Sequence, residues 1–446
     1  MAEYLTLILS SMIGVVVVTA ALMLVKREDY AWIPAILLLL PNLYTSTNYV
    51  IYPILVDVVI IGNILSLKVL ESSQYRGLDY ALMSVIGLVT SYVLYTPIST
   101  GAVNLAVYFG FLLGLFMVVS VASYFIIQIG ARPENLDAAV KAIVAFVIAT
   151  VLFFTGSVIL LSSYIIGASS LPLFILGYTL VLLGVMLEIG AAPMHIWVPD
   201  VFTAGDPIPV SILASTVKIM PLVVLVKLMA PVLANLGEAY VSFAYWLTAV
   251  MAALSMIIGN VGALTSRESA RVLAYSSIAN MGYVLAAAAV LINESALGRG
   301  QQASQALIYA LAGLITQLLV NAAGKIGYFT IIKGGGKGSV YSYLFGLSFI
   351  GTPPLLGFWS KLFIILSLIY LGPAGLWLAI FLVVNSVISI PYYVRVSREL
   401  SARAPLGITL YTVLLLLMSI VMLLGVIIPI PAMVVSLSRG LLSYIA

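Results

Sequence analysis

The sequence predicts an all-α membrane protein with about fourteen transmembrane helices. Of its 446 residues, 63% are hydrophobic and only 8% are charged, whereas about a quarter of the residues in a soluble domain are charged. Apolar runs of about twenty residues recur from one end of the chain to the other, and a run of that length can cross the hydrocarbon core as a helix. Together these observations exclude an ordinary soluble domain.

The apolar runs can be placed in order along the chain. We expect spans near residues 4–25, 31–45, 50–70, 78–96, 103–130, 137–163, 171–199, 208–232, 239–262, 270–292, 304–332, 341–371, 374–397 and 407–435. The second span is the weakest, because Pro41 and the polar stretch 44–48 shorten it. The first run continues to Val25 without a small-residue cleavage site behind a basic start, so we expect no cleavable signal peptide.

The charges in the loops predict the orientation of the chain. One set of loops holds only Arg299 and Arg439. The opposite set holds Lys26, Arg27, Lys68, Arg76, Arg132, Arg267, Arg271, Lys333, Lys337, Arg395, Arg398 and Arg403. Because basic residues concentrate on the cytoplasmic side, we expect a multi-pass protein of the cell membrane with both termini outside. The net charge of +4 is therefore interpreted as a sign of orientation and not of nucleic-acid binding.

The composition argues against a cofactor or metal in this chain. There is no cysteine to supply thiolates for an iron–sulfur cluster or a disulfide, and His195 alone cannot make a bis-histidine haem site. The stretch KGGGKGS at 333–339 lacks the spacing of a phosphate loop, because Ile331 and Gly338 stand where glycine and serine or threonine are needed. We expect a flexible cytoplasmic connection there.

Seven charged residues lie at least four residues inside the ends of the predicted spans. They are Asp57, Lys141, Glu188, Lys218, Lys227, Lys325 and Lys361. Glu188, Lys218 and Lys361 fall near the middle of their helices, and Lys325 falls somewhat nearer the cytoplasm. Ionisable residues at such depth usually line an ion or proton path, because burying a charge in the bilayer is costly. A lysine in a low-dielectric site can also exchange its proton near neutral pH.

Each of these charges also has a simpler interpretation. Lys227 could extend to the outer surface along its apolar stem, Asp57 could lie at the membrane interface, and Lys141 could anchor the cytoplasmic end of its helix. For the four deep residues, the simpler interpretation is a structural ion pair or a polar contact between helices. Because four separate helices each carry one deep charge, we favour an ion path.

Two predicted spans contain helix breakers beside a charge. In LEIGAAP (187–193), Gly190 and Pro193 follow Glu188, and in GTPPLLGFWSK (351–361) two prolines precede Lys361. Proline removes a backbone donor and frees a carbonyl, and non-helical backbone survives at membrane depth only where protein or water satisfies it. Two interrupted helices about five spans apart indicate two related halves with an ion site at the breaks, as in transporters.

These motifs resemble those of the antiporter-like membrane subunits of respiratory complex I, of related membrane hydrogenases and of Mrp-type cation/proton antiporters. PMHIWVPDVFTAGDPIPVSILASTVKI (193–219) is similar to the family's P-F-H-x-W-x-P-D stretch, its A-P-x-P-V-S turn and the lysine-bearing helix that follows. ARVLAYSSIANMGYVL (270–285) and GTPPLLGFWSK (351–361) resemble the K-R-x-L-A-Y-S-S-I-x-x-x-G-Y and G-x-P-P-x-x-G-F-x-x-K segments. PYYVRV (391–396) matches a late Tyr–Tyr–Arg motif. The resemblance covers about residues 130–400 in detail.

The resemblance implies a fold of fourteen helices. Helices 4–8 and 9–13 would form two inverted five-helix repeats, with helices 7 and 12 broken. The chain would then divide into N-terminal helices 1–3 over residues 1–77, a first repeat over 78–232, a second repeat over 239–398 and a C-terminal helix over 407–446.

The resemblance also assigns residues to a proton path. By motif match, Lys218 stands at the family's helix-8 lysine, Lys325 at a helix-11 lysine and Lys361 at the helix-12 lysine. LDAAVK (136–141) is similar to the start of the family's helix 6 and puts Lys141 at its lysine. His195 falls on the histidine of P-F-H. With Glu188, these residues form the expected path.

Two positions depart from the family pattern. The position of Glu188 is usually a lysine paired with a glutamate on helix 5, but the matching stretch 110–125 holds no acid here. Because a charge in a dry site needs a partner, we expect a cation beside Glu188, with Lys218 as the first candidate and Lys141 as the second. Asn321 stands where many relatives carry a histidine.

The resemblance implies a proton-translocating membrane subunit of a complex I-like (NADH/quinone-type) oxidoreductase. The helix-12 lysine and PDVF favour the N-type subunit. Partners would be other membrane subunits of a multisubunit oxidoreductase, which would hold the quinone, flavin and clusters, and the lipid bilayer. An Mrp-type antiporter or membrane hydrogenase subunit stays open as an alternative, as does a non-pumping scaffold, which the missing helix-5 glutamate supports.

Overall fold

The computed structural model describes residues 2–37, 39, 51–69, 77–95, 102–128, 134–166, 170–233, 236–297, 301–403, 409–427, 432, 434, 435 and 438. The predicted spans 31–45 and 407–435 fall partly outside these residues. Four of the arginines counted in the loops, Arg76, Arg132, Arg299 and Arg439, lie outside them as well.

Every regular element in the described residues is helical. The longer elements follow the predicted spans closely. The helices are α1 (Ala2–Leu24), η1 (Glu28–Tyr30), α2 (Trp32–Leu37), α3 (Ile51–Val69), α4 (Leu78–Tyr95), α5 (Ala102–Ile127), α6 (Glu134–Ile166), α7 (Leu171–Ile189), α8 (Trp197–Ala204), α9 (Pro207–Ala214), η3 (Thr216–Lys218), α10 (Ile219–Leu233), α11 (Glu238–Thr265), α12 (Ser269–Leu297), α13 (Gln301–Lys333), α14 (Ser339–Ile350), α15 (Leu356–Tyr370), α16 (Pro373–Ile388), α17 (Ile390–Glu399), α18 (Leu410–Leu423) and η4 (Leu424–Val426).

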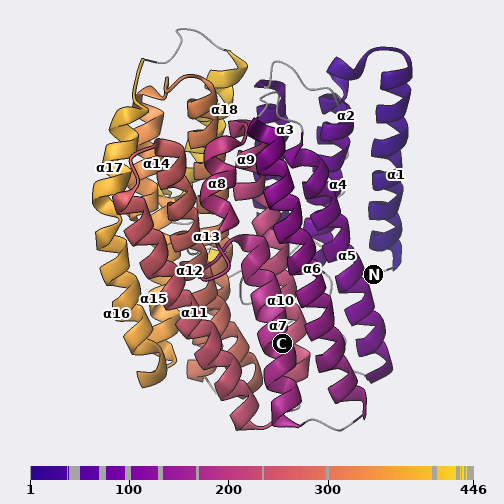
Figure 1. The fold of residues 1–446 in the computed structure, drawn as a ribbon, viewed down its shortest axis with the longest axis vertical. Coiled ribbons are helices and arrows are strands. Elements are labelled where there is room, and N and C mark those ends of the chain that lie inside the picture. Colours follow the sequence, from indigo (N-terminus) through magenta and orange to yellow (C-terminus); the bar gives the residue numbers. More distant parts are fainter. Residues whose placement is uncertain are drawn as a thin grey trace.

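The helices run roughly side by side along the long axis of the molecule (Figure 1). Helix α1 forms one edge of this view and α16 with α17 forms the other. The paired helices α12 and α13 lie between them, and α13 packs against α9, α15 and α18. The interior of the bundle is therefore built from α9–α10, α12 and α13, whose residues are almost all buried.

Length and composition make this a multi-pass membrane protein. Within the described residues, eight helical segments are long and apolar enough to cross a membrane, and five further apolar helices are shorter. The peripheral helices expose apolar side chains, such as Val144 and Val151 on α6 and Ile380 and Val384 on α16. The interior, by contrast, holds charged groups. A surface of apolar side chains around buried charges is the arrangement expected in lipid.

Both predicted helix interruptions are present. Helix α7 ends at Ile189, where Gly190 adopts a left-handed conformation with φ 68° and ψ 41°. Helix α14 ends at Ile350, where Gly351 does the same with φ 89° and ψ 43°. Glycine suits these positions because it lacks the Cβ atom that makes this conformation costly. In each case a second helix, α8 or α15, continues the crossing in the other half of the bundle (Figure 1).

A third interruption was not predicted. The expected span 208–232 is divided into α9, the 3₁₀ turn η3 and α10. The division falls at Ser215, whose φ of −112° and ψ of −93° are not helical. Asn321 of α13 donates a hydrogen bond to the Ala214 carbonyl over 2.9 Å, and Asn63 of α3 donates to the Ser215 hydroxyl over 3.0 Å. The Asn321 amide thus satisfies a backbone carbonyl at the interruption, and the Asn63 amide holds the side chain of the residue where the helix breaks.

Candidate functional site

Glu188 is the penultimate residue of α7 and only 1% exposed. Its Oε1 accepts a hydrogen bond from the Ser120 hydroxyl of α5 over 2.8 Å. Its Oε2 is buried and has no hydrogen-bond partner among the described residues. A carboxyl group with one donor and one free oxygen can take up or release a proton without breaking a network of bonds.

Among the described residues, no cation pairs with Glu188, so the predicted pairing with Lys218 or Lys141 is wrong in this structure. The ion pairs found among the described residues involve Lys141, Arg271 and Lys333, and none includes Glu188. The physical reason is the direction of the two lysine side chains. Lys218 turns toward α12, and Lys141 is held by acids at the end of α6.

Lys218 is fully buried at the end of the turn η3. Its Nζ donates to the Ser277 hydroxyl of α12 over 2.8 Å, and it lies 5.7 Å from the centre of the Phe202 ring of α8. The third interruption thus places this ammonium against the neighbouring helix with one neutral acceptor and one aromatic face. Ring faces attract cations, so the site can hold a charge without an acid.

Lys325 of α13 is also fully buried. Its Nζ donates to the Leu273 carbonyl over 2.6 Å and to the Ser276 hydroxyl, both on α12. The ring of Phe349 lies 5.1 Å away. Ser276 and Ser277 are consecutive, so two buried ammonium groups bind neighbouring residues of one helix.

Lys361 lies on α15, just past the second interruption, and is 5% exposed. Its Nζ donates to the carbonyls of Phe349 and Ile350 over 2.8 and 2.9 Å and to the Ser386 hydroxyl over 2.7 Å. These three bonds use the three protons of an ammonium group. A pocket of about 280 Å³ adjoins Lys361 and is lined mainly by apolar side chains of α15 and α16.

Polar side chains that the sequence analysis did not assign connect these lysines. Asn280 of α12 donates to the Ser276 carbonyl over 2.7 Å and accepts from Gln317 of α13 over 2.7 Å. Ser360 donates to Gln317 over 2.6 Å and directly precedes Lys361 in the chain. The result is a polar line from Ser277 to Ser360 through α12 and α13. The only signal in the sequence was the occurrence of these neutral polar residues inside apolar spans.

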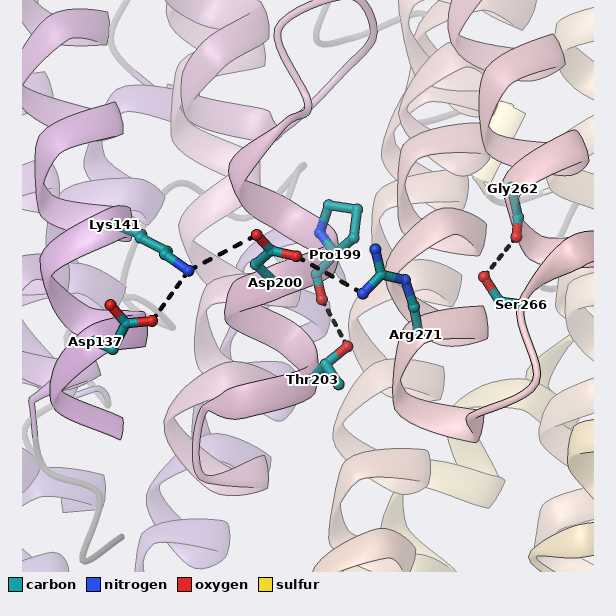
Figure 2. Close-up of polar contacts among 8 residues, drawn as sticks. All are labelled: Asp137, Lys141, Pro199, Asp200, Thr203, Gly262, Ser266 and Arg271. Atoms are coloured by element: carbon teal, nitrogen blue, oxygen red, sulfur yellow. Dashed lines mark hydrogen bonds and ion pairs between the residues drawn. The ribbon is translucent and has the colours of Figure 1, made fainter. Parts of the chain in front are cut away.

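Lys141 lies apart from this line, in an exposed charge cluster formed by α6, α8 and α12 (Figure 2). It pairs with Asp137 over 3.0 Å and with Asp200 over 3.8 Å, and Asp200 also pairs with Arg271 over 3.7 Å. The side chains of Lys141 and Asp200 are 46% and 49% exposed. This position fits the simpler interpretation, in which Lys141 anchors the end of its helix.

His195 lies in the segment between α7 and α8. Its Nδ1 is 3.2 Å from the Pro193 carbonyl, and its ring centre is 6.5 Å from that of Tyr275. The histidine is partly exposed and makes no hydrogen bond to Glu188 or to the buried lysines. The structure therefore puts it beside the first interruption and off the polar line.

The expected extension of Lys227 to the surface is wrong. Lys227 is 1% exposed and donates to the Val93 carbonyl of α4, because α10 is enclosed by other helices along its whole length. Asp57 of α3 is buried as well, at 5% exposed. Both belong to the set of charges inside the bundle.

The glycine-rich stretch 333–339 joins α13 to α14, as expected of a connection. Lys333 pairs with the buried Asp206 carboxylate over 2.8 Å, and Asp206 caps α9 by accepting from the Ile208 amide over 3.1 Å. The lysine is thus engaged in joining the ends of two helices. Among the described residues, no group of acids and histidines could hold a metal ion.

Fold and site together define a multi-pass membrane protein with buried charges on interrupted helices. The family model "NADH:quinone oxidoreductase/Mrp antiporter, TM" matches residues 108–389, which is more than half of the chain. The chain belongs to this family.

Curated relatives agree with this assignment. NADH-quinone oxidoreductase subunit N of Gemmatimonas aurantiaca is 33% identical over 243 residues, covering 52% of this chain and 45% of that protein. NADH-quinone oxidoreductase subunit 14 of Thermus thermophilus is 32% identical over 288 residues, covering 61% of each. This chain spans about half to two thirds of the length of such relatives.

Solved structures share the fold over nearly the whole chain. A chain of the membrane-bound sulfane sulfur reductase, an archaeal respiratory membrane complex, is similar with a TM-score of 0.75 and 18% identity, covering 100% of this chain and 98% of that chain. A chain of the Mrp complex from Dietzia has a TM-score of 0.73 at 14% identity, with 99% and 97% covered. A chain of respiratory complex I from Thermus thermophilus has a TM-score of 0.70 at 20% identity, with 95% and 97% covered.

Proposed function

We propose that this chain is the proton-translocating membrane subunit of a complex I-like oxidoreductase, and is similar to its N-type subunit. The observation that carries the proposal is the polar line along α12, on which Lys218 and Lys325 bind adjacent serines and which ends beside Lys361. Four charged groups at the interruptions and along this line would carry protons, namely Glu188, Lys218, Lys325 and Lys361. Lys141 and His195, which the sequence analysis included in the path, lie off this line and would not carry the protons themselves.

Repulsion between neighbouring ammonium groups would move the proton forward. Lys218 and Lys325 bind consecutive residues of α12 through neutral hydroxyl groups, with no acid between them among the contacts described. Like charges repel strongly in a low-dielectric interior. A proton that reaches Lys218 therefore favours release of a proton from Lys325 toward Lys361, with water filling the remaining gaps. Electron transfer in partner subunits would drive the cycle.

The finer topology belongs to the same proposal. Fourteen spans would form N-terminal helices over 1–77, inverted repeats over 78–232 and 239–398, and a last helix over 407–446. The two left-handed glycines that end α7 and α14 support related halves, because each precedes a proline by three residues. The basic loop residues support a cytoplasmic face opposite both termini, in a cell membrane.

Partner subunits would supply everything that this chain lacks for redox chemistry. The sequence holds no cysteine. The buried lysines and Glu188 suit the transfer of protons and not the binding of an iron–sulfur cluster. The proposed partners are the other membrane subunits of the complex, together with the subunits that bear quinone, flavin and clusters.

The proposal is tested in proteoliposomes that contain the complex purified from its own membranes. Lys361→Gln is compared with Lys337→Gln, because Lys337 is an exposed lysine away from the polar line. We expect Lys361→Gln to lower the protons moved per electron and the control to leave the ratio unchanged. An unchanged ratio in both variants would contradict the proposal.

An Mrp-type antiporter is the second candidate, supported by the shared fold with the Dietzia complex. Mass spectrometry of what co-purifies in mild detergent separates the two. Subunits that bear clusters and a quinone site indicate a redox-driven pump, whereas small hydrophobic partners alone indicate an antiporter, and sodium flux then becomes the assay. A non-pumping scaffold is the third candidate, and the unpaired Glu188 supports it.

A further inference from the structure

Phe349 is the residue that Lys325 and Lys361 share among their described contacts. It is 1% exposed and lies in the last turn of α14, directly before the second interruption. Its ring lies 5.1 Å from the Lys325 ammonium, and its carbonyl accepts a hydrogen bond from Lys361 over 2.8 Å. One residue thus touches both lysines, with its side chain on one and its backbone on the other.

The Phe349 ring is held firmly in this place. It stacks on Tyr393 of α17, with ring centres 5.1 Å apart and planes 2° from parallel. A Cβ atom at Gly324, the residue before Lys325, would clash with the ring. The ring therefore fills the space beside Lys325 closely, and water has no room there while it stays in place.

A phenyl ring can stabilise an ammonium group but cannot pass on its proton. The ring attracts the cation through its face, yet it has no atom that can accept a proton from Lys325 or donate one to Lys361. The remaining link, from Ser276 to Ser360, passes through the amide groups of Asn280 and Gln317, which hold hydrogen bonds without titrating. A proton therefore needs water to go from Lys325 to Lys361.

The two lysines also differ in access. Lys361 lines the pocket between α15 and α16, whereas Lys325 is fully buried. Phe349 stands between an enclosed lysine and one that adjoins an open space.

We propose that Phe349 is a gate that keeps Lys325 and Lys361 apart until Lys361 gives up its proton. Lys361 as an ammonium donates three hydrogen bonds, two of them to the last carbonyls of α14. As a neutral amine it has two N–H groups for three acceptors, so the two α14 carbonyls and the Ser386 hydroxyl compete for them, and the hold on the end of α14 weakens. The ring can then move and admit water, through which Lys325 passes a proton to Lys361. This inference rests on the proposed proton path.

The chain offers a matched control for Phe349. Phe345 is one turn earlier on α14, is fully buried and packs on Gly327 as Phe349 packs on Gly324. Its ring packs edge-on against that of Tyr328 and contacts none of the buried lysines in the described contacts. Phe345→Ala therefore makes a comparable cavity away from the path.

The test measures passive proton conductance in proteoliposomes of the intact complex without an electron donor. A potassium gradient with valinomycin sets the membrane potential, and a trapped dye reports internal pH. We expect Phe349→Ala to raise the conductance several-fold over the unmodified complex and over Phe345→Ala. Phe349→Leu keeps the space apolar and should leave the proton conductance low. Phe349→Gln introduces a polar side chain of similar size and should raise the proton conductance.

Each outcome either supports or overturns the proposal that Phe349 is a gate. Equal conductance in Phe349→Ala and Phe345→Ala overturns it, whether both are tight or both leak. If the alanine variant does not assemble, equal conductance in the leucine and glutamine variants overturns it. The proposed function is judged separately, since normal pumping by Lys361→Gln defeats that function whatever the leak measurements show.

Discussion

The two interrupted crossings begin alike and differ in how their ends are satisfied. Both α7 and α14 end in a left-handed glycine. At the end of α14, the Lys361 ammonium binds two free carbonyls. At the end of α7, the indole of Trp197 donates to the Leu187 carbonyl over 2.9 Å, and the nearby charge is the acid Glu188.

The difference lies in the electrostatics of a helix end. The last turn of a helix carries a partial negative charge, which favours a cation and disfavours an anion. Lys361 therefore stabilises its interruption, whereas Glu188 in the charged state would oppose the end of α7, and Ser120 is its one hydrogen-bond donor among the residues that the structure describes. Lys361 therefore contributes to the stability of the end of α14, whereas Glu188 does not contribute to the stability of the end of α7.

The largest expected effect follows from removing the stabilising charge. Among the described contacts, Lys361→Ala leaves the buried Phe349 carbonyl without a donor, while the Ile350 carbonyl keeps its bond from the Ser386 hydroxyl; an unsatisfied buried group costs about 1–3 kcal/mol. We expect a clear fall in the melting temperature of the complex as well as lost pumping. Thermal unfolding followed by tryptophan fluorescence checks this, with Lys337→Ala as control. A variant as stable as the control would show that Lys361 does not hold the interruption.

Removing the acid should act on function more than on stability. Glu188→Ala gives up one hydrogen bond from Ser120 and leaves no cation unpaired, so we expect a cost of about 1 kcal/mol with coupling abolished. Glu188→Lys should not restore coupling, because the stretch 110–125 offers it no acid. Proton pumping at matched rates of electron transfer is the measurement. Normal pumping by an assembled Glu188→Ala complex would remove Glu188 from the path.

The third interruption should be sensitive to its amide cap. Asn321→Ala leaves the buried Ala214 carbonyl unsatisfied, for an expected loss of about 1–3 kcal/mol and a partial loss of pumping through displacement of Lys218. Asn321→Asp keeps the size but not the donor and should behave similarly. The melting temperature and the pumping ratio of both variants show whether the Asn321 amide stabilises the third interruption. Stability equal to that of the unmodified complex would mean that water replaces the amide.

The smallest effect is expected at the exposed cluster of Figure 2. Asp200→Asn removes two long ion pairs, of 3.8 and 3.7 Å, between side chains that are nearly half exposed. Exposed pairs contribute roughly 0–1 kcal/mol. We expect the melting temperature and the pumping ratio to change little. A large loss of pumping would place this cluster on the path, and Lys141 with it.

The sequence alone predicted those features that depend on a residue type unusual in an apolar helix. Glycine and proline inside apolar runs located both predicted interruptions. Of the five lysines in such runs, Lys218, Lys227, Lys325 and Lys361 were found buried, and Lys141 was not. The interruption at Ser215 was missed because residues 210–220 contain neither glycine nor proline. There the break depends on amides from α3 and α13, which only the packing brings close.

The hydrogen-bond and ion-pair partners of the buried residues could not be predicted, because they depend on the direction in which side chains point once the helices pack. Lys218 was expected to face Glu188 and instead faces Ser277. Asn280 and Gln317 are uncharged. In the sequence, nothing distinguishes them from polar residues that a transmembrane helix contains without a function. Their role in the line along α12 becomes visible only when α12 and α13 are placed together.

The central claim is that protons cross through lysines joined along α12, and Lys325 tests it most directly because it lies between the two interrupted crossings. The measurement is the number of protons moved per electron by the complex that carries Lys325→Gln, in proteoliposomes, beside Lys337→Gln. We expect a lower ratio for Lys325→Gln at an unchanged content of assembled complex. A ratio equal to that of the control would contradict it.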